Sequence, residues 1–136
     1  MHTLIREVEK QSLHDRVVHL VAQRWANPAR YTITSNPGFE KNRRAGRDEV
    51  YPDLVGWTDR LGMDMIEWVA EIETEEDVTV DQAQESWRAC ADLGVPFYLI
   101  VPYGYKTSAQ ILAAELSVTL TRVYEFGFAS GTFHLL

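Results

Sequence analysis

The sequence predicts a single α/β domain, residues 1–136, with a mixed central sheet flanked by helices. Its length fits one domain with a hydrophobic core, and no linker-like segment divides it. Residues 97–101 form a continuous apolar run, which is typical of a strand buried on both faces of a parallel sheet. The composition, 46% hydrophobic and 24% charged, is that of an ordinary globular protein.

The other elements follow from periodicity and turn residues. A long apolar pattern with helical spacing ends at Asn27-Pro28, and Thr79 with Gln82 resembles a helix-capping box. Strands are predicted where β-branched and aromatic residues lie between turn signals. The predicted elements are a helix at 3–25, strands at 31–35, 49–57 and 64–74, a helix at 79–93, a strand at 97–102, a helix at 107–117 and a strand at 119–128.

Charge is unevenly distributed along a chain whose net charge is -7. Residues 64–81 contain eight acidic residues and no Lys or Arg, whereas 41–47 is basic and predicts a loop or hairpin tip. Nucleic-acid binders gain affinity from a basic surface, so an acidic protein could hold DNA only through a local patch. The candidate phosphate-binding residues are Lys41, Arg43, Arg44 and Arg47.

The single cysteine, Cys90, cannot form an internal disulfide and is interpreted as a small core residue. No apolar run approaches the roughly 20 residues of a membrane helix, and the charged N-terminal segment does not resemble a secretory signal. A cytoplasmic location without membrane association is therefore expected.

Three acidic residues are predicted to share one face of the sheet. Side chains alternate along a strand, so Glu71 and Glu73 point to the same side of strand 64–74. Pairing with strand 49–57 would place Asp53 beside them. Glutamates on a solvent-facing strand are the alternative interpretation, but the apolar neighbours and the expected crossover to strand 97–102 favour a covered face.

Closely spaced, buried carboxylates repel one another and should show raised pKa values. A hard divalent ion such as Mg²⁺ or Mn²⁺ would remove this cost, since it prefers oxygen ligands. Such an ion can polarise a phosphoryl oxygen and activate water, and a further carboxylate can take the proton. His14 and His19 do not have the spacing of a helical metal pair, so a structural or surface role is predicted for them.

These residues resemble the PD-(D/E)XK nuclease superfamily. The matching motif is Pro52-Asp53 on one strand and Glu71-Ile72-Glu73 on the next, within a restriction-endonuclease-like αβββαβ core. The resemblance implies that Asp53, Glu71 and the Ile72 carbonyl bind the metal, with Glu73 in place of the usual Lys. It also implies a helix-1 acid near the metal, here Glu7 or Glu9, and a polar residue on the following helix, here Gln84.

The expected function is divalent-metal-dependent cleavage of duplex or branched DNA by a homodimer, as the resemblance implies. Two other functions remain open. One is a catalytically inactive protein with the nuclease fold, and the other is an acidic inhibitor that binds a basic partner. The net charge and the missing Lys favour the catalytically inactive protein, and metal titration distinguishes both alternatives from the enzyme.

Overall fold

A computed structural model describes residues 2–38, 41–46 and 49–136, with side chains from residue 11 onward in the first helix. These residues form a mixed six-stranded sheet flanked by helices, which confirms the predicted α/β class. The elements are α1 (His2–Trp25), β1 (Thr32–Ser35), β2 (Leu54–Arg60), β3 (Met63–Ile72), a short 3-10 helix (Glu75–Asp77), α2 (Val80–Gln82), a π-helical stretch (Ala83–Trp87), α3 (Arg88–Ala91), β4 (Phe97–Pro102), α4 (Lys106–Glu115), β5 (Arg122–Ala129) and β6 (Thr132–Leu135).

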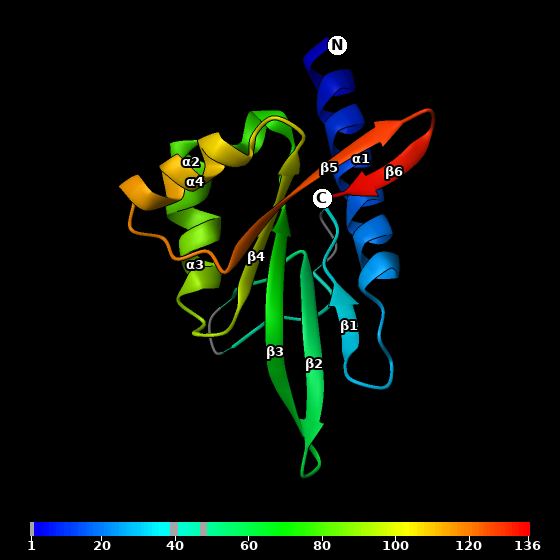
Figure 1. The fold of residues 1–136 in the computed structure, drawn as a ribbon, viewed down its shortest axis with the longest axis vertical. Helices are drawn as coiled ribbons and strands as arrows, with labels where there is room; N and C mark the ends of the chain where they lie inside the picture. The colour runs from blue at the N-terminus through cyan, green and yellow to red at the C-terminus, as the bar shows by residue number, and fades with distance from the viewer. Residues whose placement is uncertain (1, 39–40, 47–48) are drawn as a thin grey trace.

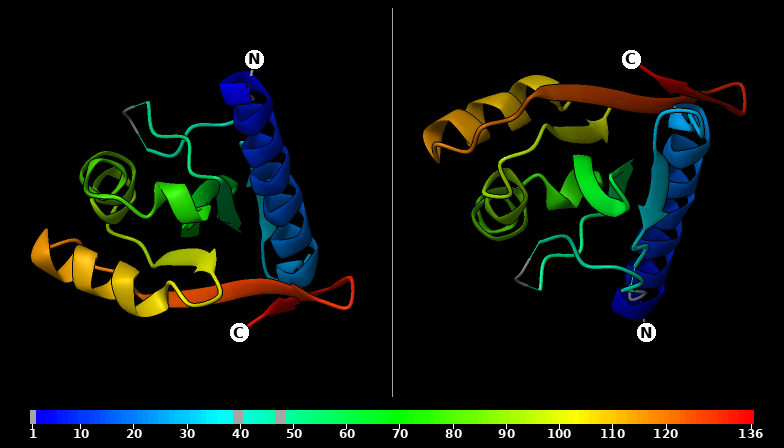
Figure 2. Two further views of the ribbon diagram at one scale, coloured as in Figure 1. Left: turned by 90° about the horizontal axis from the view of Figure 1, so that it is seen from above. Right: turned by 90° about the horizontal axis from the view of Figure 1, so that it is seen from below.

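The strands lie in the sheet in the same order as in the sequence (Figure 1). β1, β2 and β3 pair antiparallel, β3, β4 and β5 pair parallel, and β6 returns antiparallel to β5. Parallel neighbours need crossover connections, which the α2–α3 segment and α4 provide. Both crossovers lie on one face of the sheet, and α1 covers the other (Figure 2).

Each face of the sheet has its own apolar core. Under α1, Val17, Val18 and Val21 pack with Leu54 and Ala70. On the crossover side, the buried residues include Val69, Leu99, Trp87 and Ala109. Successive residues of β3 therefore enter opposite cores, which accounts for the apolar runs in the central strands.

The described part of the basic segment, residues 41–46, is a loop between the antiparallel strands β1 and β2, as the sequence predicts, and Asn36 holds its backbone. The Asn36 side chain donates to the carbonyl oxygens of Arg43 and Pro52, at 2.9 and 2.8 Å, and accepts from the Arg43 N–H at 2.8 Å. Ala45 forms a bridge with Val50 and is fully buried in the crossover-side core. Residues 41–46 are thus held against the rest of the domain, because Asn36 binds the backbone of Arg43 and Ala45 is buried in the crossover-side core.

Several element boundaries differ from the predictions, and two of these differences affect the topology or the site. β2 begins at Leu54, after Asp53, and extends to Arg60. The C-terminal segment forms two strands, because Ser130 and Gly131, both with positive φ, close a tight turn that brings β6 back beside β5. Among the described residues, no helix is long and apolar enough to span a membrane.

Candidate functional site

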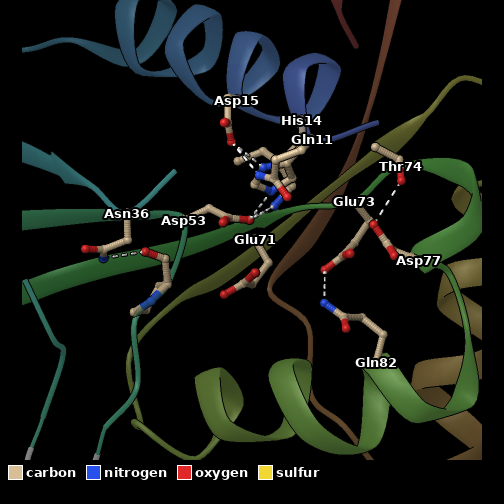
Figure 3. Close-up of polar contacts among 12 residues, drawn as sticks. Gln11, His14, Asp15, Asn36, Asp53, Glu71, Glu73, Thr74, Asp77 and Gln82 are labelled. Atoms are coloured by element: carbon tan, nitrogen blue, oxygen red, sulfur yellow. Dashed lines mark hydrogen bonds and ion pairs between the residues drawn. The ribbon is translucent and has the colours of Figure 1, made fainter. Parts of the chain in front are cut away.

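Asp53, Glu71 and Glu73 lie in one region of the molecule, where β2 begins and β3 ends (Figure 3). Leu54 pairs with Ala70, so the preceding Asp53 lies opposite Glu71 on the neighbouring strand. All three side chains are largely buried: Asp53 and Glu71 are each 8% exposed and Glu73 is 1% exposed. Carboxyl groups so withdrawn from water need hydrogen bonds, protons or a cation to compensate their desolvation.

Asp53 receives a hydrogen bond from β3 and contacts a histidine of α1. The Ile72 N–H donates to Asp53 Oδ2 at 2.8 Å, and His14 Nε2 lies 3.1 Å from the same oxygen. His14 Nδ1 is 3.0 Å from Asp15 Oδ1, which also accepts from Gln11 at 2.8 Å. Burial lowers the pKa of His14, but hydrogen bonds and charges from Asp53 and Asp15 outweigh burial and raise it to about 9. His14 is therefore a cation at neutral pH.

Glu71 and Glu73 both hold protons more tightly than an exposed glutamate. Burial raises the pKa of Glu71 well above its ordinary value, and the charges of Asp53 and Glu73 raise it further. The pKa of Glu73 is raised to about 8, mainly by burial and then by the charge of Asp53. Cys90 donates to Glu71 Oε1 at 3.3 Å, on the side of the sheet that α3 covers.

A π-helical stretch directs two donors to Glu73. Gln82 Nε2 and Trp87 Nε1 each donate to Glu73 Oε1 at 3.1 Å (Figure 3 shows Gln82). Residues five apart do not share a face of an α-helix, but the wider π-helical turn between them aligns these two. Thr79 does cap the helix, accepting from the Gln82 N–H, while the Gln82 side chain is used at Glu73.

The oxygen atoms at this site are suited to a hard divalent cation. Glu73 N–H donates to Ile100 on β4, whereas Ile72 N–H points to Asp53 on the β2 side. Because the N–H and C=O of one strand residue point to the same side, the Ile72 carbonyl also faces the β2 side. Asp53, Glu71 and this carbonyl are thus the available ligands.

Among the residues that the structure describes, no three His, Cys, Asp or Glu side chains are grouped so as to hold a metal ion. A cation at this site would therefore rest on two carboxylates and backbone oxygen. Mg²⁺ commonly binds proteins through one or two carboxylates and retains several waters, so the ligand set fits. The positive charge of His14 beside Asp53 would compete with the cation.

One other predicted site residue, Gln84, does not contact the carboxylates, and two more cannot be placed. Gln84 is exposed on the π-helical stretch. The polar helix residue that contacts the site is Gln82, which donates to Glu73. The side chains of Glu7 and Glu9 lie outside the described residues.

The basic residues do not form one free patch. Arg43 lies 3.6 Å from the centre of the Trp57 ring and pairs with Asp64 at 3.0 Å, so its side chain is bound to the sheet. Lys41 and Arg44 are exposed, and the Lys41 ammonium lies 5.3 Å from the centre of the Tyr51 ring. Arg47 lies outside the described residues.

Sequence reasoning missed His14, Gln82 and Trp87 as residues of the site. A signal for His14 is present, because this ionisable residue lies three and four positions before Val17 and Val18, within the buried stripe of α1. For Trp87 no comparable signal exists, since its contact depends on the π-helical stretch.

No protein-family model, curated protein or solved structure matches the chain. The chemistry of the buried carboxylates is therefore the basis for a functional conclusion.

Proposed function

We propose that the protein is a divalent-metal-dependent endonuclease of the PD-(D/E)XK type that hydrolyses phosphodiester bonds in DNA. The observation that carries this proposal is the buried pair Asp53, immediately before β2, and Glu71 on the paired strand β3, beside the Ile72 backbone. The order α1, β1–β3, α2–α3, β4 corresponds to the αβββαβ core of that superfamily and supports the same assignment.

Asp53 and Glu71 would hold Mg²⁺ or Mn²⁺, with the Ile72 carbonyl as a further ligand. Without a cation, the raised pKa of Glu71 keeps this carboxyl protonated, because its ionisation next to Asp53 is unfavourable. The bound ion would polarise a phosphoryl oxygen and lower the pKa of a coordinated water. The protein contributes a site that is shielded from solvent, where electrostatic interactions are stronger than in water.

Glu73 would act as the proton acceptor in the place of the usual Lys. Its pKa of about 8 is close to the pH at which an enzyme works, which suits a general base or acid. In hydrolysis, an ionised Glu73 would accept a proton from the attacking water as the new P–O bond forms, and the leaving oxygen would take a proton from solvent water as its bond to phosphorus breaks. Gln82 and Trp87 fix the orientation of its carboxyl group.

The exposed side chains of Lys41 and Arg44 would contact the DNA backbone. Arg43 is assigned a structural role instead, because it stacks on Trp57. A chain of this size offers little surface for reading a base sequence, so we propose that it acts on duplex or branched DNA as a homodimer.

Metal-dependent thermal unfolding tests the proposal. A ligand that binds only the native state raises the melting temperature with the logarithm of its concentration. Mn²⁺ should raise it in the parent protein and in Asp92→Asn, which alters an exposed aspartate, but not in Asp53→Asn. The Mn²⁺-dependent cleavage of duplex and branched DNA should be lost in Asp53→Asn and retained in Asp92→Asn. A flat response of the parent across millimolar Mn²⁺ contradicts the proposal.

The His14–Asp53 pair favours a second candidate, in which the site is purely structural. The histidine cation then takes the place of the metal, and the protein is an inactive nuclease fold or an inhibitor that binds a basic partner through its acidic surface. The net charge of -7 agrees with this alternative. This alternative predicts that Mn²⁺ does not change the melting temperature. It also predicts that a polylysine peptide binds saturably and that added salt abolishes this binding.

A further inference from the structure

A second candidate site is an aromatic pocket on the α1 face of the sheet. It has a volume of about 360 Å³ and lies at the beginnings of β4 and β5, whereas the carboxylates lie at the end of β3. We call it the aromatic pocket. Its aromatic lining consists of Trp25, Tyr31, Trp68, Tyr98 and Tyr124.

The rings of this pocket support one another in fixed orientations. Trp25 meets Trp68 edge to face with ring centres 5.5 Å apart, and it meets Tyr124 in the same manner at 5.2 Å. Tyr31 packs edge to face on Trp68 at 5.5 Å. Trp25, Tyr31, Tyr98 and Tyr124 are only partly buried, so aromatic surface remains accessible in the pocket. A rigid aromatic wall is suited to a flat ring system.

A β-bulge directs a carboxylate into the aromatic pocket. Gly56 pairs with Trp68 and Trp57 pairs with Ile66, so Glu67 is an additional residue without a partner on β2. In a bulge the local alternation is interrupted, and a side chain is redirected. Glu67 therefore lines the same pocket as its neighbour Trp68, although adjacent strand residues ordinarily face opposite sides.

One oxygen of this carboxylate is already paired, and the other is not. Glu67 Oε1 accepts from Arg30 Nε at 3.2 Å. Among the side chains that the structure describes, Glu67 Oε2 is the buried polar atom that has no hydrogen-bond partner. Buried acceptors are nearly always satisfied, so such an atom indicates a donor that is supplied from outside the chain.

Two arginines lie at or near the aromatic pocket. Arg30 is an exposed residue that lines it, with a side chain 70% exposed, and the guanidinium of Arg122 lies 4.5 Å from the centre of the Tyr124 ring. An organic cation would be attracted by the rings and by Glu67 but repelled by these two arginines. A planar ligand with N–H donors and an anionic group would fit the aromatic lining, the unpaired oxygen of Glu67 and the two arginines.

We propose that the aromatic pocket binds a guanine nucleotide, either free or as an unstacked nucleotide of a nucleic acid. The base lies against the aromatic side chains, its edge donates to Glu67, and its phosphate is near Arg30 and Arg122. Guanine offers two adjacent N–H donors on its Watson–Crick edge. One would donate to the unpaired Glu67 Oε2, and the other would share Oε1 with Arg30. Proteins commonly recognise unstacked bases by stacking and by hydrogen bonds to this edge. The proposal goes beyond the metal site and does not depend on it.

The tryptophan indole N–H signals in NMR provide a direct test. The chain has four tryptophans; Trp25 and Trp68 line the aromatic pocket, while Trp87 reports on Glu73. We expect GMP, added with EDTA, to shift the indole signals of Trp25 and Trp68 saturably and to leave that of Trp87 unchanged. AMP should bind at least about tenfold more weakly, because its edge cannot donate twice to a carboxylate. Failure of the metal proposal would appear separately, as a lack of Mn²⁺ or Mg²⁺ response at Trp87.

Glu67→Gln tests the role of the carboxylate with little change in shape. An amide offers one acceptor and one donor, which is the pairing that favours adenine, so the variant should lose its preference for GMP and gain one for AMP. Arg122→Gln is the matched control, because Arg122 lies over the Tyr124 ring whereas Glu67 pairs with Arg30. It should weaken GMP and AMP by the same factor of a few and preserve the order between them.

Three results would overturn the proposal. One is the absence of saturable shifts with millimolar GMP in the parent protein. Another is a preference for GMP that survives in Glu67→Gln, which would place the base elsewhere. The third is saturable binding of choline in the aromatic pocket without binding of GMP, which would identify it as a site for organic cations.

Discussion

Replacing Glu73 with glutamine should stabilise the metal-free protein at alkaline pH. The folded protein raises the pKa of Glu73 from its ordinary 4.5 to about 8, chiefly because the side chain is buried. Between these pH values, the unfolded chain releases a proton that the folded protein retains, so the free energy of unfolding falls as the pH rises. The stabilising contribution of protonated Glu73 is complete below about pH 4.5 and is lost as the pH passes through about 8.

The magnitude follows from the two pKa values. Their difference corresponds to about 5 kcal/mol, which is the upper limit for this group. Because Glu73 titrates together with Glu71, we expect a single substitution to remove roughly half of this amount, about 2–3 kcal/mol. Glutamine is neutral throughout and retains an oxygen that can accept from Gln82 and Trp87.

Urea unfolding in EDTA, followed by circular dichroism from pH 5 to pH 9, measures the effect. The advantage of Glu73→Gln over the parent should grow with pH and approach its full size near pH 9. Glu85→Gln is the control, since Glu85 is exposed on the same helical segment, and it should differ from the parent by a constant amount. A constant difference for Glu73→Gln as well would refute the buried, protonated Glu73.

Three further predictions concern other parts of the molecule. The pKa of His14 is raised to about 9, so His14 is a cation beside Asp53 at pH 7, and His14→Asn should tighten Mn²⁺ binding. Measured by calorimetry, the Mn²⁺ affinity of the parent should rise as the pH approaches about 9, and equal affinities of parent and variant at pH 7 would contradict competition by His14. A Cβ at Gly56 would lie 2.3 Å from Nε1 of Trp68, so Gly56→Ala should lower the free energy of unfolding by about 1–3 kcal/mol. The control Gly127→Ala meets only ordinary contacts and should change this free energy by less than about 1 kcal/mol; similar urea midpoints for the two variants would argue against the close packing at Gly56. If DNA is the substrate, replacing exposed Lys41 and Arg44 with glutamine should reduce the log–log salt dependence of binding by about 2, and an unchanged slope would place the DNA elsewhere.

Local periodicity was sufficient to predict much of the architecture. The apolar run at Phe97–Pro102 indicated a strand buried on both faces, and β4 lies inside the sheet with parallel neighbours. The alternation along β3 placed Glu71 and Glu73 on the same side, and both point to the side that α2 and α3 cover. These inferences succeed because strand parity is a local property of the backbone.

Local periodicity fails where the backbone departs from its regular repeat. A π-helical stretch shifts the helix phase after Gln82, so Trp87 reaches Glu73 and Gln84 remains exposed. A bulge interrupts the alternation of β3 and directs Glu67 into the aromatic pocket. The residues that these irregularities redirect contact partners on other elements, which no short sequence window contains.

The sequence alone determined which residues could form the carboxylate site, because the parity of two adjacent strands brings Asp53 and Glu71 to one place once these strands pair. Only the tertiary structure decided which groups surround them. His14 reaches Asp53 across 39 residues because α1 packs on the sheet, and Arg43 is turned back onto Trp57 because Asn36 binds its backbone. Contacts of this kind depend on how whole elements pack, and the spacing of residues along the chain does not specify them.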